Sequence, residues 1–340
     1  MAGNFVQLHN HTHYSLLDGA SKVPDLVKRV KELDMPAVGI TDHGNMHGAY
    51  ELWRAAVDSG VKPIIGIEAY VTPETARQDK TRVSWDTNWT PVPGHARNPD
   101  DVSGGGLITH LTMWAENDEG LVNLIKASSV ANLEGRVMRY PRMDKEVLST
   151  YSKGVIASSG CPSGIIQTRL RLGQFDEALR AAGEFQDIFG KDNFYIELMD
   201  HGLSIESKVT GDLLTIAKKL GAPLLATNDS HYVMEADKDA QDAMLCINSG
   251  ATLDDPNRFK FEGSGYYIKS AEEMRELFKD HPDACDNTLE IAERCNVIFD
   301  DHEDGAFMPQ FDCPEGWDET SLFLKKVEEG LEKRYDGNPP

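Results

Sequence analysis

The 340-residue sequence has no long hydrophobic run, no CxxC cysteine pair and no excess of positive charge. Its longest apolar stretches, such as KPIIGIEAYV, are too short to cross a bilayer. The N-terminal MAGNFVQLHN lacks the basic and apolar parts of a secretory signal. Five cysteines, an odd number, argue against a disulfide framework and favour a reducing compartment. We therefore expect a cytoplasmic protein that does not contact membranes.

Positive charge is scarce, because 34 Lys and Arg stand against 56 Asp and Glu, for a formal charge of −22. A protein that coats duplex nucleic acid normally carries a basic face. Most of the acidic side chains are expected to form a solvated surface. A polyanionic substrate would therefore have to meet locally positive chemistry, such as bound divalent metals, or be held by a partner.

Short apolar runs alternate with segments of helical periodicity. Strands are predicted at 5–8, 37–41, 63–68, 107–112, 154–158, 194–198 and 223–227, and helices at 22–34, 47–59, 117–132, 174–189 and 204–220. Repeated strand–helix units predict a parallel sheet, and seven of them favour a distorted TIM-like (βα) barrel in the α/β class. Such barrels carry their reactive residues at the carboxyl ends of the strands.

Two segments interrupt this alternation. Residues 72–106 contain two tryptophans, four prolines and SGGG, and they predict an inserted surface loop. After residue 256, RFKFEGSGYYIKS predicts a strand pair, and helices are expected at 271–279 and 282–295.

Side chains that can bind metals occur at or near the end of every predicted strand. In an extended segment, alternate side chains point to the same side, so the first two histidines would face one site. The candidates in chain order are His9, His11, Asp18, His43, Glu68, His110, Cys161, Asp229 and His231.

This mixture of imidazole, carboxylate and thiolate suits Zn²⁺, Mn²⁺ or Fe²⁺ better than Ca²⁺ or Mg²⁺. Nine ligands are too many for one tetrahedral ion, so two or three clustered divalent transition metals are expected. Clusters of this type activate water and favour hydrolysis of phosphoesters. Amide hydrolysis is the competing chemistry, but no lysine stands at the end of a predicted strand.

Other polar residues near these strands receive weaker interpretations. Asp42 is expected to orient a neighbouring ligand, and His13 to stay outside the metal site. Glu197 and His201 are weak ligand candidates. No role is assigned to His47, His95, His281 and His302.

The motifs LHNHTHYSLLDGA, GITDHGNMHGAYEL, PIIGIEAYV and TNDSHY resemble the polymerase and histidinol phosphatase (PHP) family, and within it the N-terminal domain of bacterial replicative polymerase alpha chains. The resemblance implies a seven-stranded PHP barrel with three metals. It places His9, His11, Glu68 and Asp229 on one metal, Glu68, His110 and Cys161 on a second, and Asp18, His43 and His231 on a third. It also implies that Asp18, His43 and Glu68 are catalytic.

The same resemblance implies a PHP phosphoesterase domain over 1–270, and a linker with the start of a polymerase palm region over 271–340. The implied activity is a 3′–5′ exonuclease that proofreads DNA. The implied partners are the primer 3′ end, the remainder of a polymerase chain in cis, and replisome components such as the sliding clamp. A stand-alone phosphomonoesterase and a metal-stabilised scaffold for a separate proofreading subunit remain as alternatives.

Overall fold

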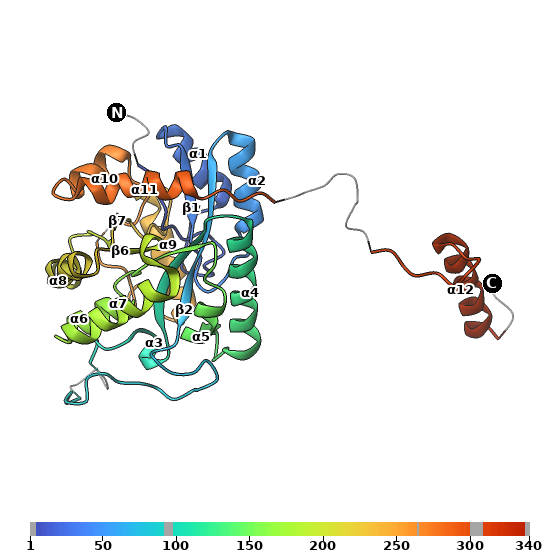
Figure 1. Ribbon diagram of the computed structural model, residues 1–340, viewed down its shortest axis with the longest axis horizontal. Helices are drawn as coiled ribbons and strands as arrows, with labels where there is room; N and C mark the ends of the chain where they lie inside the picture. The colour runs from blue at the N-terminus through green and yellow to red at the C-terminus, as the bar shows by residue number, and fades with distance from the viewer. Residues whose placement is uncertain (1–4, 92–97, 264, 300–308, 337–340) are drawn as a thin grey trace. The chain divides into compact units, whose positions relative to one another are not determined.

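The computed structural model describes residues 5–91, 98–263, 265–299 and 309–336, so His95 and His302 lie outside the described residues. Two compact units divide the chain, Met1–Ile298 and Phe299–Pro340 (Figure 1). Within the described ranges, no helix is both long enough and apolar enough to cross a membrane.

The first unit is built on a curled mixed sheet with helices packed outside it (Figure 1). Its strand order is β1-β2-β3-β5-β6-β7, and the short β4 pairs with β2. The α/β barrel class predicted from the sequence is confirmed. The strands are β1 (Ala37–Ile40), β2 (Lys62–Val71), β3 (Thr109–Ala115), β4 (Arg142–Met143), β5 (Val155–Ser158), β6 (Phe194–Leu198) and β7 (Leu224–Ala226).

The sheet is not fully parallel, which corrects one expectation. Strand β3 is antiparallel to both β2 and β5, while β1–β2, β5–β6 and β6–β7 are parallel. The reversal places the beginning of β3 at the rim where β2 ends, because His110 pairs with Tyr70. His110 therefore reaches the expected rim from the start of a strand rather than from its end.

The segment predicted as the first strand, 5–8, is not part of a continuous ladder. Gln7 instead forms an isolated β-bridge with Val38 of β1, and Asn10 forms one with Ser230 after β7. Backbone N–H groups of Gly39 and Ser230 donate to Gln7 and His9 respectively. The N-terminal segment thus joins the two edges of the sheet.

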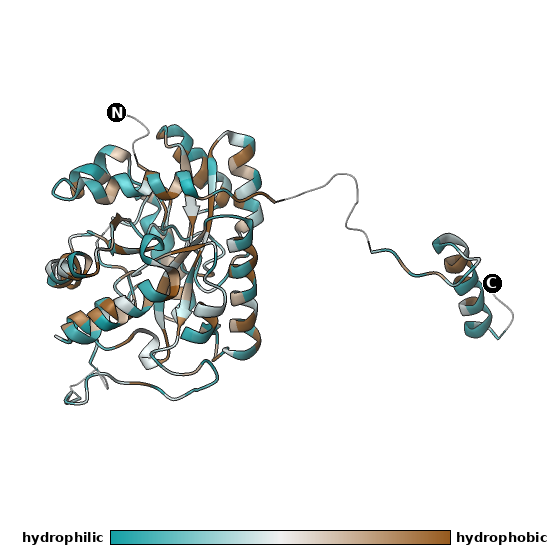
Figure 2. Cartoon of the chain, viewed as in Figure 1, coloured by the Kyte–Doolittle hydropathy of each residue, from teal (hydrophilic) through white to brown (hydrophobic). Residues whose placement is uncertain are grey.

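In the first unit the longer helices carry hydrophobic residues along one side, as the hydropathy colouring shows (Figure 2), and several of them bury that side against the sheet. In α1, for example, Leu26 and Val30 are fully buried one turn apart. The helices are α1 (Val23–Glu32), α2 (Ala49–Ser59), α3 (Ser103–Gly106), α4 (Asp118–Glu134), α5 (Lys145–Thr150), α6 (Ile165–Arg171), α7 (Phe175–Phe189), α8 (Ser204–Leu220), α9 (Lys238–Ser249), α10 (Ala271–Leu277), α11 (Pro282–Arg294) and α12 (Glu319–Arg334), with 3₁₀ turns η1 (Lys191–Asn193) and η2 (Glu235–Asp237).

Helix α11 belongs to the core of the first unit. Its Ile291 is fully buried in one cluster with Val6, Ile64 and Trp114. The compact unit consequently runs to Ile298, past residue 270, where the sequence analysis placed the end of the first domain.

The predicted strand pair over 258–270 is wrong for the described part of that segment, which contributes one isolated bridge, Tyr232 to Tyr267. The chain docks there through the Tyr266 carbonyl, which accepts from the backbone N–H groups of His231 and Tyr232. In the second unit, Asp318 caps the N-terminus of α12, because its side chain accepts from the Ser321 N–H.

Candidate metal centre

The rim of the sheet brings all nine predicted ligands together. His43 bridges to Glu68 at the end of β2, His110 bridges to Gly164 after β5, and Asn10 bridges to Ser230 after β7. Residues far apart in the chain therefore meet because the ends of the parallel strands and the start of the reversed β3 lie at the same rim.

Glu68 lies at the centre of the cluster, with its side chain almost wholly buried. One oxygen lies 2.6 Å from His43 Nδ1 and 3.6 Å from His11 Nε2. The other lies 3.2 Å from His110 Nδ1 and 3.5 Å from His9 Nε2. A carboxylate with four imidazoles around its two oxygens is placed to bridge more than one metal.

Asp229 is the second carboxylate on this side of the cluster. Its Oδ1 lies 3.1 Å from His11 Nε2 and 3.4 Å from His9 Nε2. Its backbone is left-handed, with φ of 43°, a conformation that Asp tolerates better than most residues. These three residues form one of the groups whose ligand atoms lie close enough to share an ion.

Asp18 lies on the loop after the N-terminal segment and contacts two other imidazoles of the cluster. Its carboxylate lies 3.1 Å from His43 Nε2 and 4.0 Å from His231 Nε2. Gln241 of α9 donates to its backbone carbonyl at 3.0 Å. The preceding Leu17 has a φ of 61°, which is strained for a leucine, so the loop is held in a conformation its sequence does not favour.

Cys161 lies beside His110, with 3.4 Å between Sγ and Nδ1. Burial, followed by the charges of Glu68 and Asp229, raises the pKa of the Cys161 thiol well above its usual range. The sulfur would ionise only next to a cation, as a metal ligand does.

The residues fit a metal centre, because buried ligand atoms lack hydrogen-bond partners. Unpaired buried polar atoms are rare in folded proteins and costly. Among the described residues, the buried atoms that approach one another without hydrogen-bonding geometry include His9 Nε2, His11 Nε2, Asp18 Oδ1, His43 Nδ1, both oxygens of Glu68, Asp229 Oδ1 and His231 Nε2.

Hydrogen bonds behind the cluster fix which imidazole nitrogen faces inward. His9 Nδ1 lies 2.7 Å from the buried Glu197 carboxylate, which only accepts hydrogen bonds when ionised. His231 Nδ1 lies 2.8 Å from the Asp229 carbonyl oxygen. In both rings Nδ1 is therefore the donor, and the lone pair of Nε2 faces the cluster.

His11 is oriented by a relay through Ser15. The Ser15 hydroxyl donates to Asp42 Oδ1 at 2.7 Å, so its oxygen accepts from His11 Nδ1 at 2.9 Å. Asp42 also accepts from the Thr12 N–H and hydroxyl, at 2.7 and 2.8 Å. Asp42 thus acts behind a ligand, as the sequence analysis expected.

The electrostatics hold His11 and Asp18 in metal-binding protonation states. Burial and then the charges of His43 and His231 lower the pKa of His11 to about 3. Burial would raise the pKa of Asp18, but the hydrogen bond from His43 and the charges of the nearby imidazoles lower it to about 2. An imidazole must be neutral and a carboxylate ionised to bind a metal. At neutral pH, His11 is neutral and Asp18 is ionised.

His9 and His43 instead have raised pKa values. Burial would lower the pKa of His9, but Glu197 raises it well above the usual range. Burial would also lower the pKa of His43, but Tyr70 and Glu68 raise it well above that range. These two rings must therefore lose a proton to bind a metal.

Several other polar residues fall outside the cluster. His13 is half-buried against the Tyr14 ring, with 4.3 Å between ring centroids. His201 pairs with Glu206 at 2.6 Å and stacks on Tyr266. Glu197, a weak ligand candidate, lies behind His9 instead.

Sequence reasoning missed Ser15, which orients His11, and Tyr70, whose ring packs beside His43 and His110. It also missed Tyr140, which packs against Tyr70, and Arg139, whose guanidinium lies near the Tyr140 ring. A serine four residues after His11 and an Arg-Tyr pair before β4 carry no recognisable motif, so nothing in the sequence alone marked them.

Comparison with known proteins identifies the family of the chain. The family model described as PHP domain matches residues 7–201, more than half of the chain. The chain belongs to the PHP domain family, as the motifs predicted.

The similar curated proteins are more specific. The chain is 51% identical over 338 residues to the DNA polymerase III subunit alpha of Mycobacterium leprae, covering 99% of this chain and 28% of that protein. It is 39% identical over 335 residues to the DNA polymerase III subunit alpha of Borreliella burgdorferi, covering 97% of this chain and 27% of that protein. The chain thus spans little more than a quarter of the length of these relatives. An amidohydrolase structure from Chromobacterium violaceum is similar at 15% identity and a TM-score of 0.40, over 67% of this chain and 87% of that one.

Proposed function

We propose that this chain is the metal-dependent phosphoesterase module of a bacterial replicative DNA polymerase alpha chain, and that it removes misincorporated nucleotides from the primer 3′ end. The observation that carries the proposal is the set of buried, unpaired ligand atoms that converge on Glu68. Divalent transition metals held there would supply activated water and stabilise charge on a phosphoester. Zn²⁺, Mn²⁺ and Fe²⁺ all suit these ligands.

The ligands divide among three metal positions in the proposal. His9, His11, Glu68 and Asp229 would hold the first, Glu68, His110 and Cys161 the second, and Asp18, His43 and His231 the third. The contacts of Asp229 with His9 and His11, of Cys161 with His110, and of Asp18 with His43 support this division.

Asp18 and His43 are proposed to act at the substrate side of the centre, and Glu68 beneath it. The side chains of Asp18 and His43 are 21% and 14% exposed, whereas that of Glu68 is 1% exposed. Glu68 therefore positions its imidazole neighbours and holds negative charge inside, and the Asp18–His43 pair is reachable by a reacting group.

The relatives support the polymerase context of the proposal. Because both carry the name DNA polymerase III subunit alpha and match nearly the whole chain, we infer that the rest of a polymerase chain follows in cis. The segment Phe299–Pro340 would then lead into the polymerase palm region. The primer 3′ end and, through the complete protein, the sliding clamp are the proposed partners in the bacterial cytoplasm.

The proposal is tested with the purified chain, a 5′-labelled DNA primer carrying a 3′ mismatch, and added Mn²⁺ or Zn²⁺. The primer is expected to become shorter from its 3′ end. The Asp18→Asn chain should shorten it at least about a hundredfold more slowly, as expected for loss of a catalytic group. Equal trimming by both chains would indicate a contaminating nuclease. Bound metal with no trimming by the wild-type chain would favour the scaffold alternative, and cleavage of a small phosphomonoester alone would favour the phosphatase.

A further inference from the structure

The metal centre opens to solvent on one side. His9, His11 and His231 are at most 2% exposed, whereas the side chains of His43 and His110 are 14% and 12% exposed. Asp18 and Asp229 are exposed by 21% and 15%. A substrate therefore reaches the cluster where Asp18, Asp229, His43 and His110 are partly exposed.

Tyr70 and Tyr140 form an aromatic wall at this opening. The Tyr70 ring lies nearly parallel to His43, with centroids 5.9 Å apart, and edge-on to His110 at 5.4 Å. The Tyr140 ring packs edge-on against Tyr70 at 5.0 Å. The two tyrosines thus extend from the ligands outward toward the loop before β4.

Arg139 completes this wall. Its guanidinium carbon lies 5.4 Å from the centre of the Tyr140 ring. It donates to the Asn248 side chain on α9, and Asn248 Nδ2 donates to the Leu17 carbonyl at 3.2 Å. The hydrogen bond with Tyr140 raises the pKa of Arg139, and the charge of Asp18 contributes to the same shift. Arg139 is therefore a permanent cation held beside the loop that carries Asp18.

A second cation near the rim is already committed to contacts within the protein. Arg171, behind Cys161, is mostly buried and contacts Asp100 at 3.3 Å while donating to the Pro162 carbonyl. A guanidinium has five N–H donors. Arg139 uses these donors on the Asn248 side chain and on Tyr140, which leaves the others available to a ligand.

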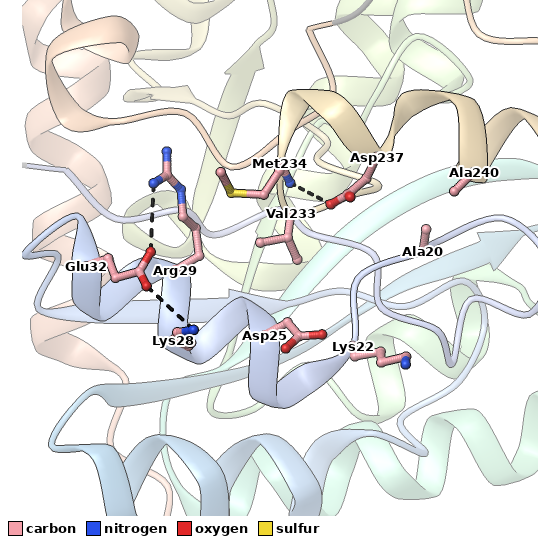
Figure 3. A pocket seen from close by; sticks show the side chains of 10 residues that line it. All are labelled: Ala20, Lys22, Asp25, Lys28, Arg29, Glu32, Val233, Met234, Asp237 and Ala240. Carbon is pink, nitrogen blue, oxygen red and sulfur yellow. Dashed lines mark hydrogen bonds and ion pairs between the residues drawn. The ribbon is translucent and has the colours of Figure 1, made fainter.

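A cavity of about 420 Å³ between α1 and the turn before α9 is a weaker candidate for an anion-binding site (Figure 3). It presents basic side chains, but Lys28 and Arg29 both reach toward Glu32, at 3.9 and 4.0 Å. Asp25 and Asp237 also line it, so its charges balance and it has no preference for an anion.

We propose that Arg139 binds a phosphate of single-stranded nucleic acid at the opening of the metal centre, and that Tyr140 positions the guanidinium for this contact. The inference rests on the proposed function, because it takes a phosphodiester as the substrate. A guanidinium pairs with phosphate oxygens through two parallel hydrogen bonds. The acidic protein, with a formal charge of −22, thereby meets a polyanion through one placed cation as well as through its metals.

The test measures binding without turnover. A fluorescein-labelled oligothymidylate with phosphorothioate linkages at its 3′ end is titrated with the chain in Mn²⁺, and anisotropy is followed at several salt concentrations. Arg139→Gln is expected to weaken binding about tenfold and to reduce the slope of log K against log[salt] by about 0.7, the loss of one phosphate contact on a single strand. Arg139→Lys should keep the slope and weaken binding only a few-fold. Tyr140→Leu should weaken binding with the slope unchanged.

Arg136 offers a matched control, because it lies in the same loop, is exposed, and donates to the Met138 carbonyl. Arg136→Gln is expected to bind within about twofold of wild type. Equal losses in the Arg136 and Arg139 variants, or no loss in Arg139→Gln, would overturn the inference. If no metal supports hydrolysis yet the Arg139-specific loss persists, the proposed reaction fails and the phosphate site stands.

Discussion

The Glu197→Gln substitution tests whether a carboxylate that accepts a hydrogen bond from a metal ligand, without binding metal itself, strengthens metal binding. The Glu197 carboxylate is fully buried and accepts from His9 Nδ1 at 2.7 Å, from Thr227 Oγ1 at 2.5 Å and from Ser158 Oγ. The amide keeps the shape and one acceptor oxygen, and the Ser158 hydroxyl can turn to accept from its NH₂ group. The negative charge that makes His9 a stronger ligand is lost.

The expected cost is therefore in metal affinity rather than in folding. Loss of a supporting carboxylate weakens metal binding by about 10- to 100-fold, or about 1.4–2.7 kcal/mol. The free energy of unfolding of the metal-free chain should change by no more than about 1 kcal/mol, because each hydrogen bond has a replacement. Competition with a fluorescent chelator measures the affinity, and urea unfolding in EDTA measures the stability.

Glu206→Gln provides the control, since Glu206 pairs with His201 Nδ1 at 2.6 Å in a buried site that holds none of the predicted ligands. It should leave metal affinity unchanged. Wild-type affinity in Glu197→Gln, or an equal loss in Glu206→Gln, would refute the reasoning that the buried carboxylate tunes His9.

Three further predictions concern stability. Removing bound metal with a chelator should lower the melting temperature, since a ligand at 100 times its Kd stabilises the folded chain by about 2.7 kcal/mol. Added Mn²⁺ should restore the melting temperature. An unchanged melting temperature after verified metal loss would contradict the metal centre. Burial lowers the pKa of Lys269 to about 8, so between pH 8 and 10.5 the unfolded chain binds a proton that the folded chain does not, and stability rises with pH. Urea unfolding across this range should show a gain of about 2–3 kcal/mol for wild type that Lys269→Met lacks, and parallel profiles would be inconsistent with a buried lysine. Ile291→Ala should cost about 2–5 kcal/mol by denaturant unfolding, and a loss below about 1 kcal/mol would mean that α11 does not belong to the first unit.

The alternation of strands and helices was predictable because each apolar run has the length and periodicity of its element. The direction of β3 was not. The sequence between Val71 and Thr109 is an insertion rather than a helix of ordinary length, and an insertion lets the chain return in either direction. His110 was still identified, because a ligand at the start of a reversed strand reaches the same rim as one at the end of a parallel strand.

The types of ligand could be read from the sequence, but their orientation could not. A histidine that binds metal almost always donates from its second nitrogen to an acceptor, and the groups that orient His9 and His11 in this way include residues from remote parts of the chain. Glu197 is 188 residues from His9, and Asp42 acts on His11 through Ser15. Such contacts exist only once β6 and β1 pack beside the N-terminal segment. The motif therefore specifies which atoms could bind metal, and the fold decides which lone pairs face inward.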